Sequence, residues 1–386
     1  MIETQRHRGT EIANFLPLKL SAQSWKFPEL ILQCLSVSVF NFLTKNLGPS
    51  LIKSAIFLLL CFTGCQKITE VHVEVTDHQT TVFSGEAMVM QYKIIIGQPL
   101  NETQIDQISR LIITLFQEVN QIYNKWNPDS EISALNRLKA NTKVPISQKL
   151  ETLLEKTDEI VSLSESRFDP TIEPIQKLWK KSLAINQIPE KEEIEKIAPA
   201  IGWRNIHFHQ GIFYKDHDLT ALDLGGIAKG LAIDLIAERL EELGYPDIYV
   251  EWGGEIKALG QHPENRPWTI FIGGLTSEDP DDAIDTLYLN NAAIATSGDY
   301  LQNWSVPAAG PDNKTTYFHI FDPKTLSPLV TTAHSIASAS VMCGSCALAD
   351  GLSTSAMLFP NVEAAEKWAE KIRQQIPEVS FWIVSR

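Results

Sequence analysis

The sequence predicts an α+β fold, and three stretches support this prediction. Residues 81–96 alternate apolar and polar side chains, which is typical of paired strands. Residues 101–123 repeat apolar side chains at the spacing of an amphipathic helix. Residues 221–234, with the sequence ALDLGGIAKGLAID, indicate a short strand, a glycine turn and the start of a second helix. The chain of 386 residues has room for one large domain or two medium ones.

The composition narrows the classes of function. The formal net charge of −14 argues against a general nucleic-acid-binding surface, so we expect no nucleic-acid partner. Five cysteines do not make a disulfide scaffold. Cys343 and Cys346 form a CxxC pair, for which a redox motif or a disulfide is conceivable. Because no thioredoxin-like βαβ pattern surrounds them, we expect two small core residues.

The N-terminal region predicts export. Residues 1–50 contain no recognisable motif and are left unassigned, and translation is expected to begin near Leu51. Residues 51–64 combine Lys53, a short apolar run and small residues before Cys65, which is typical of a lipoprotein signal peptide. The FTGC sequence resembles a lipobox, so Cys65 is the expected lipidation site; one uncleaved N-terminal anchor is the alternative. Residues 65–80 are predicted to be a linker, and residues 81–386 the folded domain.

The remaining elements are predicted from periodicity and from turn residues. Ser130 caps a short helix, and Gly253-Gly254 is expected to form a bulge between strands, with close approach of a ligand as the alternative. The further helices are expected at 131–136, 150–164, 171–179, 188–199, 346–358 and 361–376, with a hairpin at 205–214 and strands within 248–260, 268–274, 291–299, 317–323, 335–342 and 379–384.

The glycine turn is a candidate phosphate site. A helix N-terminus presents unpaired N–H groups and the positive end of its dipole to an anion. Gly225 and Gly226 permit close approach of a ligand to the backbone, and Lys229 adds a mobile positive charge. The alternative is an ordinary turn with Lys229 on the surface.

Three other stretches carry side chains suited to chemistry. Asp169, in the sequence FDPT, either aims its carboxylate at a ligand or caps the following helix. His319 lies on a predicted strand beside an Asp-Pro turn, and a lone histidine is more often structural than catalytic. Asp350 and Thr354 are four residues apart on one predicted helix face, and their oxygen atoms suit Mg²⁺. The alternative is an exposed Asp350 and a Thr354 bonded to its own helix.

Eight motifs occur in an order that resembles the ApbE family of FAD:protein FMN transferases. They are a lipobox, DSEISALN, FDPTIEP, DLGGIAKG, VEWGGE, ATSGDY, HIFDPKT and ADGLST. The resemblance extends from about Ser84 to the C-terminus. It implies a single catalytic body related to the T-fold, with mixed sheets flanked by helices. It also implies an enzyme that cleaves FAD with Mg²⁺, joins FMN to a Thr or Ser hydroxyl of a partner protein and releases AMP.

The resemblance assigns roles to particular residues. His319 and Lys229 are expected to be catalytic, and His319 either accepts the proton of the acceptor hydroxyl or orients a phosphate. The FAD-binding positions are Met88, Trp126, Arg167, Phe168, Asp169, Asp223, Lys229 and Phe321, and the metal ligands are Asp350, Thr354 and the backbone carbonyl of Gly226. Four features depart from the family pattern, namely Trp126 in place of Tyr, Glu173 in place of Gly, Lys180-Lys181 in place of small residues and Leu326-Ser327 in place of Gly-Tyr.

The resemblance also implies a location and partners. The protein is expected at the periplasmic face of a bacterial inner membrane, held there by a lipid anchor. Its expected acceptors are flavin-carrying subunits such as those of sodium-pumping NADH:quinone oxidoreductase. Two alternatives use the same donor site: hydrolysis of FAD to FMN and AMP by water, or storage of FAD without turnover.

Overall fold

The structure is a computed structural model that describes residues 71–76, 79–273, 283–299, 303–307 and 314–386. Residues 66–386 form one compact unit. The predicted signal peptide, Cys65 and residues 1–50 lie outside the described residues. Among the helices that are described, none is both long enough and apolar enough to cross a membrane.

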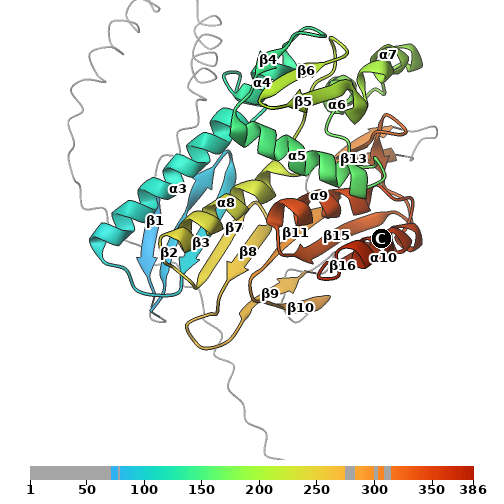
Figure 1. The fold of residues 1–386 in the computed structure, drawn as a ribbon. Coiled ribbons are helices and arrows are strands. Elements are labelled where there is room, and N and C mark those ends of the chain that lie inside the picture. The colour runs from blue at the N-terminus through green and yellow to red at the C-terminus, as the bar shows by residue number, and fades with distance from the viewer. Residues whose placement is uncertain (1–70, 77–78, 274–282, 300–302, 308–313) are drawn as a thin grey trace, which may run out of the picture. The chain divides into compact units, whose positions relative to one another are not determined.

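The centre of the fold is an antiparallel sheet of eight strands, which confirms the predicted α+β class (Figure 1). Its strand order is β1-β2-β3-β7-β8-β11-β15-β16, and every neighbouring pair is antiparallel. The strands are β1 (His72–Val75), β2 (Thr81–Ala87), β3 (Met90–Ile96), β7 (Ile248–Trp252), β8 (Glu255–Leu259), β11 (Ala292–Gly298), β15 (Ile336–Cys343) and β16 (Ser380–Ser385).

Helices cover one face of this sheet (Figure 1). They are α3 (Glu102–Ile122), α5 (Gln148–Leu163), α8 (Ala228–Glu242), α9 (Cys346–Met357) and α10 (Val362–Gln375). Their apolar sides pack against alternate residues of the strands, such as Val250 of β7 and Val341 of β15, to form the two largest hydrophobic clusters. The same alternation turns Glu255 and Lys257 of β8 toward α8, where each meets a charged side chain.

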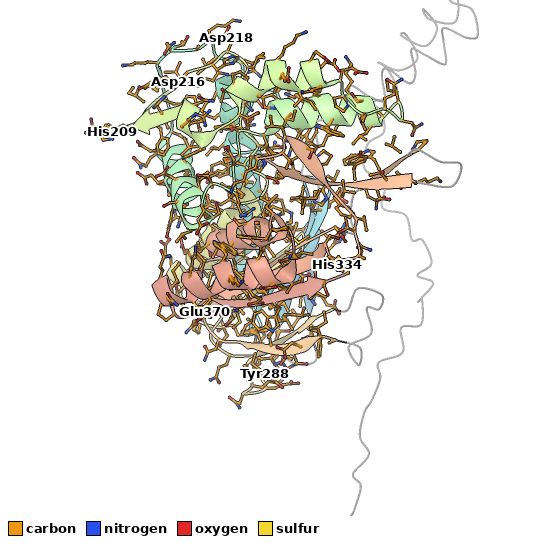
Figure 2. All side chains as sticks on the ribbon, turned by 90° about the vertical axis from the view of Figure 1, so that its right-hand side faces the viewer. His209, Asp216, Asp218, Tyr288, His334 and Glu370 are labelled. Carbon is orange, nitrogen blue, oxygen red and sulfur yellow. The ribbon has the colours of Figure 1, made fainter. Side chains whose placement is uncertain are left out.

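The hairpin of β9 (Trp268–Ile272) and β10 (Asp285–Leu289) packs on the other set of alternate residues. Its apolar side contacts Ala258 and Ile294, the neighbours in sequence of residues that face the helices. Figure 2 shows Tyr288 of β10 at one end of the view and His209, the last residue of β5 (Ile206–His209), near the other. The hairpin and the helices thus bury opposite faces of one sheet.

Two small sheets and α6 complete the body. One has the order β4-β6-β5 and the other the order β12-β13-β14. Trp179 of α6 packs with Phe321 of β13 in a cluster of their own. The elements are α4 (Glu131–Asn136), β4 (Val144–Pro145), α6 (Glu173–Leu183), α7 (Lys191–Ile197), the short 3₁₀ turns Ala198–Ala200 and Trp203–Asn205, β5 (Ile206–His209), β6 (Ile212–Lys215), β12 (Asn303–Pro307), β13 (Lys314–Asp322) and β14 (Ser327–Val330).

Several local predictions are confirmed. Ser130 caps α4, as predicted. The structure adds a cap that was not predicted, because Asn101 caps α3 through a reciprocal bond with Gln104. The exposed helix α7 buries none of its residues, as its charged sequence predicts. Cys343 and Cys346 are free thiols buried in the core, and burial raises the pKa of Cys343 to about 11. A thiol of that kind is inert, in agreement with the predicted core role.

Other local predictions are wrong. Gly253-Gly254 is no bulge, because Trp252 and Glu255 pair directly and the two glycines form the tight turn of the β7–β8 hairpin, with φ of 66° and 102°. The segment before the glycine turn forms a single bridge between Ala221 and Ile172 rather than a strand. Strand β1 lies inside the predicted linker, because its alternating residues extend the edge of the sheet beside β2.

Candidate active site

One cavity collects most of the residues that the sequence singles out. Its volume is about 370 Å³, within the range of small-molecule sites. It lies where the loops after α3, α5 and the glycine turn meet the ends of strands β8, β11 and β13. Its lining is formed by Lys125, Trp126, Phe168, Asp169, Pro170, Ile172, Gln176, Lys180, Asp223, Gly225, Gly226, Lys229, Gly253, Glu255, Thr296, Ser297, Gly298, His319, Ile320, Phe321, Asp350, Thr354 and Leu358.

The glycine turn borders this cavity and is held by Asp223. The backbone N–H of Asp223 donates to Pro170 O at 2.7 Å, and its Oδ1 accepts from the N–H of Gly225 at 3.0 Å. The turn presses Gly226 against two neighbours, since a Cβ on Gly226 would lie 3.0 Å from a ring carbon of Phe168 and 3.2 Å from Thr354 Oγ1. A side chain there would be crowded, so glycine suits the close packing of this turn beside Phe168 and Thr354.

Helix α9 presents its polar face to the same point. Asp350 is 2% exposed, and its Oδ2 accepts from the N–H of Gly230 at 3.1 Å. Thr354 Oγ1 lies 3.1 Å from Ser297 Oγ on β11, so it bonds across elements and not to its own helix. The structure thus removes both parts of the alternative interpretation, because Asp350 is buried and Thr354 faces the cavity.

Lys229 joins this carboxylate to a second one. Its Nζ lies 2.8 Å from Glu255 Oε1 and 3.3 Å from Asp350 Oδ1. Burial works to lower the pKa of Lys229, but the carboxylates of Asp350 and Glu255 raise it above its ordinary value. Burial raises the pKa of Glu255 to about 7, with Asp350 adding to the rise and Lys229 opposing it. We call Lys229, Glu255 and Asp350 the Lys229 cluster.

The N-terminus of α9 is fixed by Asp234 of α8. Its Oδ1 accepts from the backbone N–H of Cys346 at 3.0 Å and its Oδ2 from that of Ala347 at 3.0 Å. Lys257 of β8 neutralises the carboxylate at 2.7 Å. The helices also touch, because a Cβ on Gly230 would lie 2.3 Å from Cys346 O. Asp234 and Gly230 therefore set the position of α9, and with it that of the Asp350 carboxylate relative to Lys229.

A second ion cluster includes Lys125 and Asp223, which also line the cavity. Lys125 contacts Glu173 Oε2, lies 2.7 Å from Asp223 Oδ2 and donates to Gln176 Oε1 at 3.1 Å. Burial works to raise the pKa of Asp223, yet Lys125 lowers it below the ordinary value. Trp126 is 75% exposed beside this cluster, with the Nζ of Lys125 5.0 Å from its ring centroid. We call Lys125, Glu173 and Asp223 the Lys125 cluster.

The residues of the FDPT segment divide between lining and support. The Asp169 carboxylate is occupied by the chain itself, because it accepts from Thr171 N at 2.9 Å and from Trp203 N at 3.0 Å. Asp169 does not cap α6, whose N-terminal residue Ile172 makes no side-chain cap. Arg167 donates to Leu358 O at 2.8 Å and does not line the cavity.

His319 lines the cavity and Met88 does not. Met88 occupies the β2–β3 turn with φ of 49° and packs against the large hydrophobic cluster, outside the cavity lining. His319 lies on β13 where the pairing with β14 shifts register between Tyr317 and Phe321. An irregular ladder breaks strict alternation, so His319 and Phe321 both border the cavity together with Ile320 between them.

The donors around Asp350 fit a magnesium ion. A buried carboxylate, a hydroxyl and the backbone of Gly226 converge there, all of them hard oxygen donors. In the part of the chain that the structure describes, no group of three or more His, Cys, Asp or Glu residues could hold a metal. Mg²⁺ does not need such a cage, since it keeps waters and takes phosphate oxygens from its substrate.

Sequence reasoning did not identify four functional contributors. Lys125 and Glu255 supply the charged partners of Asp223 and Lys229, Asp234 fixes α9, and Ser297 bonds Thr354. Glu255 directly follows the double glycine of VEWGGE, which was the one local signal for it. The others lie far in sequence from the residues they contact, so no spacing rule points to them.

The comparisons with known proteins agree with one another. The model of the ApbE family matches residues 86–379, more than half of the chain. The chain is 35% identical over 316 residues to the FAD:protein FMN transferase of Chlamydia pneumoniae, covering 81% of this chain and 93% of the relative. It is 37% identical over 293 residues to that of Chlamydia trachomatis, covering 75% and 88%.

Solved structures share the fold. The flavin transferase ApbE of Vibrio cholerae aligns with a TM-score of 0.65 at 25% identity, covering 81% of this chain and 94% of that one. The apo flavinyl transferase ApbE of Pseudomonas stutzeri aligns with a TM-score of 0.67, covering 83% and 93%, and at 24% identity it supports the fold alone.

Proposed function

The chain belongs to the ApbE family, and on that premise we propose that it transfers FMN from FAD to a Thr or Ser hydroxyl of a partner protein and releases AMP. The observation that carries the proposal is the convergence of Lys229, Asp350, Thr354 and Gly226 on one cavity. Phosphoryl transfer is catalysed mostly by positioning and charge neutralisation, and these groups supply both.

The reaction exchanges one phosphorus–oxygen bond for another. The acceptor oxygen bonds to the FMN phosphorus, the bridging oxygen of the pyrophosphate leaves with AMP, and the hydroxyl proton must be accepted. Mg²⁺ held by Asp350, Thr354 and the Gly226 carbonyl would act as a Lewis acid on the pyrophosphate. Lys229 places positive charge beside the same group.

In this proposal His319 accepts the proton of the Thr or Ser hydroxyl of the acceptor. It borders the cavity from β13. An imidazole titrates near neutral pH and is suited to accept a proton there. Trp126 and Phe168 offer aromatic faces to the donor at the cavity wall, where flat ring systems stack well.

The cellular setting extends the proposal. A lipid on Cys65 would hold the protein at the periplasmic face of an inner membrane, next to flavin-carrying subunits such as those of sodium-pumping NADH:quinone oxidoreductase. The support is the lipobox FTGC after a short apolar run. Cys65→Ala is expected to move the protein from the membrane to the soluble fraction, and unchanged membrane association would contradict the anchor.

Two alternative functions use the same donor site. In the first, water replaces the acceptor hydroxyl and FAD is hydrolysed to FMN and AMP. In the second, the protein is a carrier that binds FAD without turnover. The buried Asp350 and its contact with Lys229 favour catalysis over storage, because binding alone does not need a carboxylate held 2% exposed beside a lysine.

Mass spectrometry of an acceptor domain tests the proposal. The acceptor carries one reactive Thr and is incubated with the protein, FAD and Mg²⁺. We expect a mass gain equal to FMN and one AMP per modified acceptor. A Thr→Val acceptor is the matched control and should stay unmodified. AMP release with an unmodified acceptor would support the hydrolase, and tight FAD binding without AMP would support the carrier.

A further inference from the structure

Lys229 carries a single positive charge and lies between two carboxylates, those of Glu255 and Asp350. It lies closer to Glu255 Oε1, at 2.8 Å, than to Asp350 Oδ1, at 3.3 Å. Asp350 is also a ligand of the cation in the function proposed above, on which this inference rests. A lysine on Asp350 competes with a cation for the same oxygen atoms, because both neutralise the same charge.

Glu255 is placed to relieve that competition. It is 3% exposed, lines the cavity from the first position of β8 and keeps Lys229 close. Its second oxygen, Oε2, is buried without a hydrogen-bond partner among the described residues. A buried carboxylate with a vacant oxygen is costly, and such sites are retained where a ligand or a moving charge uses them.

We propose that Glu255 is a positioning residue that takes over Lys229 when Asp350 binds the divalent cation. In the metal-free protein Lys229 bridges both carboxylates. On cation binding Asp350 turns its oxygen atoms to the cation, and Lys229 remains paired with Glu255 instead of being left as an unpaired buried charge. The cluster thus keeps Lys229 beside the pyrophosphate while freeing Asp350.

The arrangement of the strand supports this role. Glu255 follows the tight Gly253-Gly254 turn, and a Cβ on Gly253 would lie 3.4 Å from Glu255 Oε2 and 3.6 Å from Lys229 Cδ. The turn therefore lies directly beside both Glu255 and Lys229.

Direct binding of Mn²⁺, followed by electron paramagnetic resonance without FAD, tests the proposal. Four proteins are compared: wild type, Glu255→Gln, Lys229→Met and the double variant. We expect Glu255→Gln to weaken Mn²⁺ binding by about tenfold or more, as loss of partners around a metal ligand does. In the Lys229→Met background the same change should alter the Kd by less than about twofold, because no lysine competes.

Two further variants complete the design. Glu255→Asp keeps the negative charge on a shorter side chain and should bind Mn²⁺ more tightly than Glu255→Gln. If Glu255→Gln lost affinity only because it folds poorly, restoring the charge would not restore binding. Asp350→Ala should abolish binding and thereby identify the site. Equal weakening by Glu255→Gln with and without Lys229 would overturn the proposal and make Glu255 a ligand itself. An unchanged Kd in both backgrounds would also overturn it, while FMN transfer by the wild type would leave the proposed function standing. A wild type that binds no Mn²⁺ would overturn both.

Discussion

The two ion clusters of the cavity have the same composition but differ in how fully the oxygen atoms of their carboxylates are paired. Each places one lysine between two acidic side chains. In the Lys125 cluster Glu173 also pairs with Lys177 at 3.0 Å, and Asp223 also accepts from the N–H of Gly225. In the Lys229 cluster Asp350 likewise accepts from the N–H of Gly230, but its contact with the lysine is longer, and Glu255 keeps one oxygen without a partner among the described residues.

The difference indicates which cluster serves structure and which serves chemistry. A well-paired cluster fixes the loop after α3 against α6 and the glycine turn, and the role of Asp223 as an FAD-binding residue stays a prediction. An unsatisfied cluster retains oxygen atoms and charge for a substrate or a cation. The pKa values point the same way, because that of Asp223 is lowered and that of Glu255 is raised to about 7.

The largest expected effect separates the two lysines by stability. Lys125→Met removes the cation between two buried carboxylates, leaving Glu173 with the exposed Lys177 and Asp223 with the N–H of Gly225, and should lower the free energy of unfolding by about 3–5 kcal/mol. Lys229→Met should cost about half of that or less, because Glu255 can take up a proton near neutral pH. Urea denaturation at pH 7 measures both. Equal losses would break the distinction between the clusters.

The support of α9 gives the next effect. Asp234→Asn replaces an oxygen that accepts a backbone N–H by an amide donor, and should cost about 2–3 kcal/mol. It should also reduce AMP release, since Asp350 moves with α9. Ser345→Ala, which removes the hydroxyl that caps α9 beside Asp234, is the milder control at about 1 kcal/mol. Full activity in Asp234→Asn would show that the Lys229 cluster does not depend on this cap.

The pH dependence of stability tests the raised pKa of Glu255 in the Lys229 cluster. The pKa of Glu255 rises from 4.5 to about 7 on folding, so between these values the native state holds a proton that the unfolded state has lost. The free energy of unfolding contributed by Glu255 therefore falls as the pH rises through this window. Denaturation of the metal-free protein across the window should show a fall in the wild type that is absent in Glu255→Gln. Parallel curves would contradict the raised pKa.

The smallest effect concerns backbone strain in the β2–β3 turn, outside both clusters. Val89, in the β2–β3 turn, is 71% exposed and has φ of 63°, where a β-branched residue is strained. Val89→Asn should raise the free energy of unfolding by about 0.5–1 kcal/mol, because Asn tolerates this conformation. The melting temperature measures the gain. A loss of stability would mean that Val89 makes contacts that outweigh its strain.

Much of the fold follows from local sequence rules. The cap of α4, the exposed helix α7 and the buried strand β15 agree with prediction, because each rests on a short pattern of side chains. The Gly253-Gly254 turn was misjudged because a bulge and a two-residue hairpin both require positive φ. Strand β1 was missed because its residues are all exposed and gain their order only by pairing with β2.

The site was predictable only in part. Motif resemblance located Lys229, Asp350 and Thr354, and the structure brings them to one cavity. Lys229, Asp350 and Thr354 lie on helices, whereas their partners Glu255 and Ser297 lie on strands β8 and β11 of the large sheet. Only the packing of the helices on these strands brings them together. Arg167 and Met88 lie outside the cavity lining, and their roles as FAD-binding residues remain predictions.

The most direct test compares two matched glutamates, one from each cluster. Glu255→Gln and Glu173→Gln are assayed for AMP release from saturating FAD while Mg²⁺ is titrated. The account predicts that Glu255→Gln raises the half-saturating Mg²⁺ concentration by about tenfold or more. Glu173→Gln should leave that concentration within about twofold of the wild type while lowering the melting temperature. The reverse pattern, with the Mg²⁺ requirement shifted by Glu173→Gln alone, would contradict the assignment of the Lys229 cluster to chemistry.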